Sequence, residues 1–284
     1  MDVNLNNPQQ WLFPTLLHSY SWNEEVKRGQ VQLCNQEHFW QCATLTNPTD
    51  HLWCLDDVTG YARVILGVNQ ANEPIYVMVD FKSDASLKSL YLAHPDFCPI
   101  EGIVDQARAL VQCIHHEQLR ELVEDALSLP AVNRYFWTCP ASIRDHHCYA
   151  GGLAQHTVEV ATMIACSDLD IPDKDIGLAF ALLHDIGKVQ SYEQGELTKA
   201  ASEIGHEGVG YTILAPLLEK FEQHDPSNGK TMIELLNGTW KRSTNERRPL
   251  AIGRVVNAFD QLSCERNLQR RQQWQPIDIT QDKW

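Results

Sequence analysis

The chain has 284 residues, and its 37 acidic side chains outnumber its 23 basic ones, which gives a formal net charge of −14. Apolar residues make up 43% of the sequence and charged residues 21%, a balance typical of a folded globular protein. The longest apolar run, 178–183, is far shorter than the roughly 20 residues of a membrane span. The N-terminus lacks the pattern of a secretory leader, so we expect a cytoplasmic protein without a membrane partner.

The charged residues are distributed unevenly along the chain. Residues 1–229 carry 13 basic and 31 acidic side chains, whereas residues 230–284 carry 10 basic and 6 acidic ones. A local basic segment can follow a phosphate backbone even in an acidic protein, although a solvated loop is the commoner explanation.

The nine cysteines include no Cys-x-x-Cys pair. We therefore expect reduced thiols, and neither a disulfide framework nor a thiolate zinc site.

In chain order, residues 1–27 form an N-terminal segment before the first predicted domain, which covers residues 28–99. Apolar residues alternate there with polar ones, and a turn rich in Asp and Gly lies at 55–60. The clearest alternation comprises Ile75, Val77, Val79 and Phe81. Several short strands at spacings near ten residues predict a small β-barrel, similar to an OB-fold.

The apolar period changes to that of helices beyond Pro99. We predict a helical connector over 100–134, an all-α domain over 135–266 and a polar tail over 267–284. The fold class is thus α+β, with a small N-terminal β domain followed by a helical domain. The helical patterns of the second domain cover 150–166, 173–185, 205–222 and 247–266.

Two histidines and two carboxylates fall on apolar helix faces of the second domain. His156 shares a stripe with its apolar neighbours, and His184 and Asp185 end an apolar helix. Asp260 lies four residues after Val256, again on an apolar face. A buried carboxylate is costly without a cation, so a divalent metal is expected. The alternative is internal pairing, for example of Asp260 with Arg254 or Arg266.

This set resembles the HD-domain metal-dependent phosphohydrolase superfamily over roughly 135–265. The string 140–157, PASIRDHHCYAGGLAQHT, is similar to YhaM-type 3′-to-5′ exoribonucleases, which carry an N-terminal OB-fold. A related domain with paired histidines occurs in relaxase-like proteins of conjugative elements. The resemblance implies that the metal ligands are His156, His184, Asp185, Asp260 and, as the extra histidine of two-metal members, His206.

The second metal site of such members would need a further histidine, which the stretch 235–240 does not contain. His224 lies too early to replace it, so one metal site is expected and the second is open. A nitrogen and oxygen ligand set without thiolates favours Mn²⁺, with Fe²⁺, Co²⁺, Ni²⁺, Zn²⁺ or Mg²⁺ as alternatives.

The resemblance also assigns roles in catalysis. Asp185 would orient the attacking water, and Lys188 would contact a phosphate oxygen unless it is an ordinary charge at a helix end. His146 and His147 would hold the phosphate or protonate the leaving oxygen, unless they belong to an ordinary polar loop. Arginine and lysine contacts to the strand and stacking of aromatic rings on bases are expected from Arg144, Lys241, Arg242, Arg247, Arg248, Tyr149 and Trp240.

The sequence thus favours a metal-dependent phosphodiesterase or 3′-to-5′ exonuclease for single-stranded RNA or DNA. A nucleotide phosphohydrolase is the second hypothesis. A relaxase-like or degenerate HD module that binds nucleic acid without turnover is the third. The expected partners are therefore a nucleic acid strand or a nucleotide, with a homo-oligomer possible for any of the three.

Overall fold

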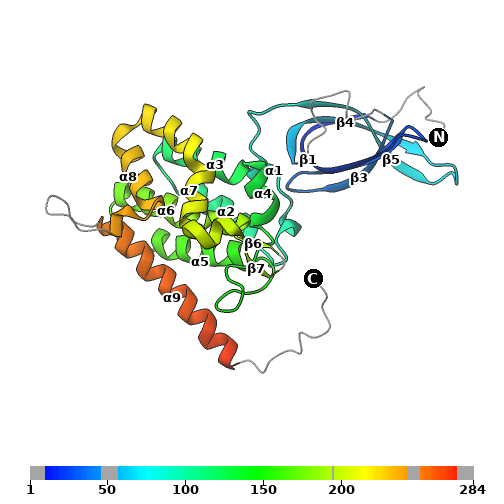
Figure 1. Ribbon diagram of the computed structural model, residues 1–284. Helices are drawn as coiled ribbons and strands as arrows, with labels where there is room; N and C mark the ends of the chain where they lie inside the picture. The colour runs from blue at the N-terminus through cyan, green and yellow to red at the C-terminus, as the bar shows by residue number, and fades with distance from the viewer. Residues whose placement is uncertain (1–9, 46–56, 194, 242–249, 274–284) are drawn as a thin grey trace. The chain divides into compact units, whose positions relative to one another are not determined.

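The computed structural model describes residues 10–45, 57–193, 195–241 and 250–273 (Figure 1). The chain forms two compact units, one made of residues 1–97 with 127–134 and the other of residues 98–126 with 135–284. The first division falls between Phe97 and Cys98, beside the position expected near Pro99. Among the described residues, no helix has both the length and the apolar character needed to cross a bilayer.

The first unit contains a closed β-barrel of five strands in the order β1-β2-β3-β5-β4. All neighbouring strands are antiparallel except β3 and β5, which pair in parallel. The predicted α+β class with an N-terminal barrel is therefore confirmed. The strands are β1 (Gln10–Asn23), β2 (Arg28–Cys34), β3 (Phe39–Thr44), β4 (Val58–Val68) and β5 (Pro74–Ser83).

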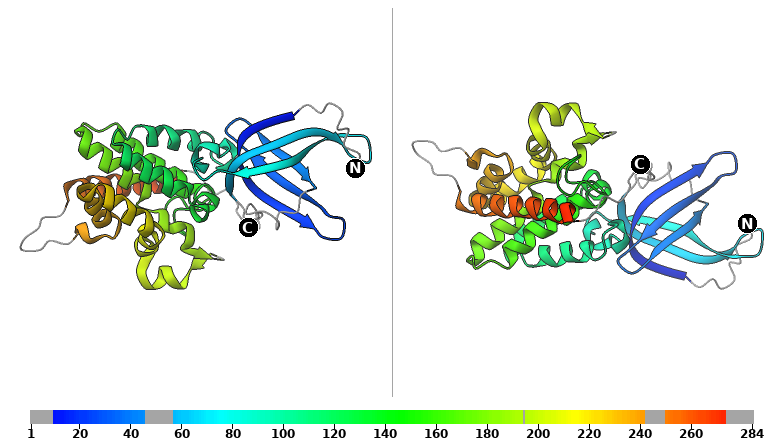
Figure 2. Two further views of the ribbon diagram at one scale, coloured as in Figure 1. Left: turned by 90° about the horizontal axis from the view of Figure 1, so that it is seen from above. Right: turned by 90° about the horizontal axis from the view of Figure 1, so that it is seen from below.

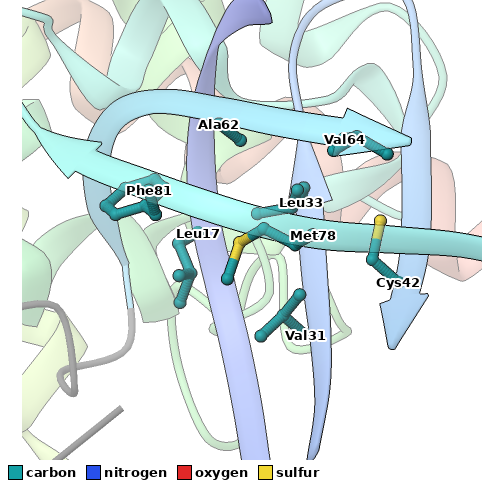
Figure 3. Close-up of a cluster of buried hydrophobic side chains, with 8 residues drawn as sticks. All are labelled: Leu17, Val31, Leu33, Cys42, Ala62, Val64, Met78 and Phe81. Carbon is teal, nitrogen blue, oxygen red and sulfur yellow. The ribbon is translucent and has the colours of Figure 1, made fainter. Parts of the chain in front are cut away.

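The barrel interior is filled by apolar side chains from every strand, as Figure 3 shows. Alternate residues of a strand point inward. In β5 this holds for only part of the predicted alternation: Val77 and Phe81 are buried, whereas Val79 is 39% exposed and Met78 is buried in its place, beside a register shift in the pairing with β4. Burial raises the pKa of the Cys42 thiol to about 12, so this cysteine stays neutral and packs as a small apolar group. The cluster consists of Leu17, Val31, Leu33, Cys42, Ala62, Val64, Met78 and Phe81.

Strand β1 corrects the sequence interpretation, which placed residues 1–27 before the β domain. The register between β1 and β2 shifts between Leu17 and Ser19, so the strand carries a β-bulge. Leu16 and Leu17 are both fully buried, Leu17 inside the barrel and Leu16 in a separate cluster with Cys34 and Leu92. Consecutive buried residues hide the period of two by which a strand is recognised.

The second unit is helical, and α5, α6 and α9 pack on one another in it (Figure 2). Helix α6 is buried at every residue from Asp175 to Leu183, as expected for a central helix. The segments from the first unit onward are α1 (Ser89–Leu92), η2 (Pro95–Phe97), α2 (Ile103–Gln112), α3 (Glu117–Ser128), α4 (Pro130–Phe136), α5 (Gly152–Ala165), α6 (Ile171–Leu183), η3 (Ile186–Gln190), β6 (Tyr192–Glu193), β7 (Glu196–Leu197), α7 (Lys199–His224), α8 (Pro226–Leu236), η4 (Thr239–Lys241) and α9 (Ala251–Gln273).

Helix α9 continues to Gln273, whereas the sequence predicted a polar tail from residue 267. The reason is a long-range contact. The buried side chain of Asn267 accepts a hydrogen bond from the His147 amide at 2.8 Å and donates one to the Tyr149 hydroxyl at 3.0 Å. These bonds tie the last turns of the helix to the loop before α5.

Candidate metal centre

The five predicted ligands come from four segments of the helical unit and meet at one place. His156 lies on α5, His184 follows α6, Asp185 precedes η3, His206 lies on α7 and Asp260 on α9. Nε2 of His156 is 3.0 Å from an oxygen of Asp260 and 3.5 Å from one of Asp185. Nε2 of His184 is 3.5 Å from Asp185, and Nε2 of His206 is 3.2 Å from its other oxygen.

Two glycines bring α7 to this place. A Cβ atom on Gly187 would overlap the carbonyl oxygen of His206 and the amide nitrogen of Gly210, so η3 can approach α7 only with glycine there. Gly205 has a φ of 71°, a left-handed conformation that glycine adopts at little cost. The chain bends at Gly205, and His206 follows directly.

The hydrogen bonds of His184 fix which ring nitrogen can bind a metal. Its Nδ1 lies 2.8 Å from the carbonyl oxygen of Ala181. A carbonyl only accepts, so Nδ1 carries the hydrogen and Nε2 carries the lone pair. That Nε2 atom is buried and has no hydrogen-bond partner among the described residues.

His156 is fixed in the same way by two residues that the sequence analysis did not single out. The Ser263 hydroxyl donates to a carboxylate oxygen of Glu159 at 2.7 Å, which leaves its oxygen to accept from Nδ1 of His156 at 3.1 Å. Nε2 of His156 therefore also carries a lone pair, and it too lacks a hydrogen-bond partner in the described part of the chain.

Two imidazole lone pairs thus face two carboxylates, an arrangement of acceptors only that a cation would stabilise. The ligand atoms of His156, His184 and Asp260 all lie within 4.8 Å of one another. The residues present therefore fit a divalent metal with nitrogen and oxygen ligands. No ion pair among the described residues joins Asp260 to Arg254 or Arg266, the alternative that the sequence left open.

The buried Lys188 is part of this centre and pairs with one of its carboxylates. Its ammonium donates to Asp185 at 2.6 Å. Burial alone would raise the pKa of Asp185, but Lys188, followed by His184 and His206, outweighs it and holds the pKa well below the usual range. Burial likewise opposes the charge of Asp260, yet His156 and His184 lower the pKa of that carboxyl. Both carboxylates are therefore charged at neutral pH.

The two adjacent histidines before α5 differ in exposure. His147 is fully buried, with Nε2 3.3 Å from a carboxylate oxygen of Glu159, so in this conformation it cannot contact a substrate phosphate. The ring of His146 lies 5.4 Å from that of His156. Burial, and then the nearby Lys188, lower the pKa of His146 to about 4. His146 is therefore neutral at pH 7, which disfavours its predicted role as a proton donor.

A pocket of about 140 Å³ opens beside the centre. Lys241 lies at its edge, but its ammonium is 2.6 Å from Glu207. Trp240 also lines the pocket, yet it is only 6% exposed and packs edge-to-face against Phe180. The expectation that Trp240 stacks on a base is therefore wrong. The lining residues include His184, Asp185, His206, Glu207, Lys241 and Asp260.

The other predicted substrate contacts lie away from these residues or outside the description. Arg144 is exposed on the loop before α5. The Tyr149 hydroxyl is engaged by Asn267 and donates to Gln155. His224, which the sequence analysis set aside as a second-site metal ligand, lines a different pocket, between α3 and α7. Arg242, Arg247 and Arg248 lie outside the described residues, so their predicted role stays a prediction.

Sequence spacing could have indicated the residues that support the centre. Glu159 follows His156 by three residues, and Ser263 and Cys264 follow Asp260 by three and four, so each shares a helix face with a ligand. The Cys264 thiol lies 3.6 Å from an oxygen of Asp260. Burial, and then Asp260, raise the pKa of this thiol to about 12. Against expectation, a cysteine therefore lies next to the predicted metal ligands.

Comparison with known proteins agrees with this geometry. Residues 153–264 match the family model described as HD domain. No curated protein and no solved structure gave a significant match to the chain. The matched segment contains every predicted metal ligand, and the β-barrel lies before it. Residues 153–264 of the helical unit are thus similar to an HD domain.

Proposed function

We propose that the protein is a metal-dependent phosphodiesterase that removes nucleotides from the 3′ end of single-stranded nucleic acid. The observation that carries the proposal is the pair of buried Nε2 atoms, on His156 and His184, that face two charged carboxylates inside an HD domain. Metal-dependent hydrolysis of phosphate esters is the chemistry that HD domains suggest.

The residues of the centre would share the work as follows. His156, His184, Asp185 and Asp260 would hold the metal, and Mn²⁺ fits this nitrogen and oxygen set. A bound divalent metal lowers the pKa of a water molecule and stabilises negative charge on phosphate oxygens. Lys188 fixes one oxygen of Asp185, and His206 lies beside the other, so this carboxylate is held in one orientation.

Two observations support a nucleic acid strand as the substrate. The pocket of about 140 Å³ is smaller than the roughly 300–1,000 Å³ of sites that enclose a whole small molecule, so most of the substrate would lie outside it. The barrel order β1-β2-β3-β5-β4, with its parallel β3–β5 pair, is also compatible with an OB-like fold, a class that binds oligonucleotides.

A nucleotide phosphohydrolase is the second candidate, because the described cations nearest the pocket are already paired. Lys188 is bonded to Asp185, and Lys241 is bonded to Glu207. Of the described residues, little unpaired positive charge therefore remains there to follow a long polyanion, whereas a mononucleotide would need little more than the metal.

The deciding experiment uses oligonucleotides labelled at the 5′ end, together with free nucleotides, in the presence of Mn²⁺. A ladder that shortens one nucleotide at a time supports the exonuclease. Release of phosphate from mononucleotides alone supports the second candidate. Absence of any metal-dependent product overturns both and leaves a binding module without turnover.

The same assay is run on Asp185→Asn, which should lose both bound metal and hydrolysis. The matched control is Glu203→Gln, which alters an exposed carboxylate on α7 that pairs with Lys199. The control should keep the metal content and the rate. Unchanged metal content in Asp185→Asn would contradict the ligand assignment.

A further inference from the structure

A second group of donor atoms gathers around His156 and includes a cysteine. The ligand atoms of His146, His156 and Cys264 all lie within 4.8 Å of one another. They come from the loop before α5, from α5 and from α9. Nε2 of His146 is buried and, like Nε2 of His156, has no hydrogen-bond partner within the described residues.

The distances suit a tetrahedral ion after small movements. Zinc bonds of roughly 2.0–2.3 Å place neighbouring donors about 3.3–3.8 Å apart. Donors at most 4.8 Å apart would therefore need to close by about 1 Å or slightly more, which rotations of side chains can supply. Asp260 completes a set of four, since one oxygen lies 3.0 Å from Nε2 of His156 and 3.6 Å from the sulfur of Cys264.

We propose that His146, His156, Cys264 and Asp260 form a second position for a metal ion, selective for a thiophilic ion such as Zn²⁺ or Co²⁺. Sulfur ligands favour such ions, whereas carboxylates favour Mn²⁺ and Mg²⁺. Binding converts the Cys264 thiol to a thiolate and releases its proton to solvent. The inference rests on the proposed function in one respect: His156 and Asp260 belong both to this ligand set and to the set proposed for catalysis.

The shared histidine makes the two positions mutually exclusive. Nδ1 of His156 is occupied by Ser263, so the ring offers a single nitrogen to a metal. An ion bound beside Cys264 takes that nitrogen away from the set that contains His184 and Asp185. The identity of the bound metal therefore decides which ligand set is complete.

Titration of the metal-free, full-length protein with Co²⁺ tests the inference, because a cobalt–thiolate bond gives a charge-transfer absorption in the near ultraviolet. The band should appear in the wild type and disappear in Cys264→Ser. Cys148→Ser changes another half-buried cysteine, which belongs to neither ligand group among the described residues, and should keep the band. The affinity for Zn²⁺ should fall at least about tenfold in Cys264→Ser, while that for Mn²⁺ changes by less than about threefold.

A band that is absent from the wild type, or that survives in Cys264→Ser, overturns the inference. His146→Ala is the second variant and must also lose the band. It provides an independent test if the Cys264→Ser protein fails to fold. The proposed function fails separately. A band that persists in Asp185→Asn, together with unchanged Mn²⁺ affinity in that variant, supports the thiolate position and contradicts the first ligand set.

Discussion

Replacing Ser263 with alanine tests whether a hydroxyl on α9 prepares His156 for a metal. The hydroxyl accepts from Nδ1 of His156 at 3.1 Å and donates to Glu159 at 2.7 Å. Without it, the ring is free to adopt the tautomer with the hydrogen on Nε2, which can donate to Asp260 only 3.0 Å away. That hydrogen would occupy the lone pair that the metal needs.

Loss of a group that orients a metal-binding histidine typically weakens metal affinity by about 10–100-fold. This range corresponds to about 1.4–2.7 kcal/mol. Calorimetric titration of the metal-free protein with Mn²⁺ measures it, and urea unfolding in the presence of a chelator measures stability separately. Ser167→Ala is the control, since its hydroxyl bonds only the carbonyl of Ile164 among the described residues, at the end of α5. Unchanged Mn²⁺ affinity in Ser263→Ala would refute the reasoning, even if stability falls.

Three further changes probe the helical unit. Burial opposes the charge of Glu159, but hydrogen bonds from His147 and Ser263 outweigh burial and lower the pKa of Glu159 below 4.5. The charged Glu159 therefore stabilises the fold above pH 4.5, and this stabilisation is lost as the pH falls through the lowered pKa. The unfolding free energy of Glu159→Gln, measured by urea titration without metal, should therefore fall less steeply with acid than that of the wild type; parallel slopes would contradict this. Asp175→Ala removes the acceptor of two backbone N–H groups at the start of α3 and should lower the unfolding free energy by about 2–4 kcal/mol. The control Asp170→Ala removes one exposed helix cap and should lower it by about 1 kcal/mol. Gly187→Ala should destabilise the helical unit by about 1–3 kcal/mol and weaken Mn²⁺ binding, because the added methyl group overlaps the backbone of α7. Wild-type stability together with wild-type Mn²⁺ affinity would show that η3 and α7 need not approach so closely.

The fold class could be predicted because local periods report it. Alternation in β5 and the helical spacing beyond Pro99 depend only on neighbouring residues. Strand β1 could not, since Leu17 fills the barrel while the neighbouring Leu16 packs against Leu92, so two consecutive residues are buried. The end of α9 could not either, because Asn267 is held by a loop about 120 residues earlier in the chain.

Four of the predicted metal ligands were accessible to sequence reasoning because each is a polar residue on or at the end of an apolar helix, whereas His206 came from the family resemblance alone. The partner of Lys188 and the burial of Trp240 could not be predicted, since both depend on how the helices pack. Lys188 donates to Asp185, and the indole of Trp240 is buried. Cys264 was missed because a cysteine without a nearby second cysteine does not indicate a thiolate zinc site, although its spacing of four residues from Asp260 places both on one helix face.

The pairing of these lysines has a consequence for substrate binding under the proposed function. Lys188 and Lys241 each neutralise a carboxylate beside the pocket, so within the described part of the chain the charge of a phosphodiester would be met chiefly by the metal. Binding of the strand, and not only its hydrolysis, should then require Mn²⁺. Fluorescence anisotropy with a phosphorothioate oligonucleotide, which resists hydrolysis, separates the two steps. Affinity should fall at least about tenfold when a chelator removes the metal, which corresponds to about 1.4 kcal/mol. Equal affinity with and without metal would instead place the main contacts to the strand on cations away from the centre.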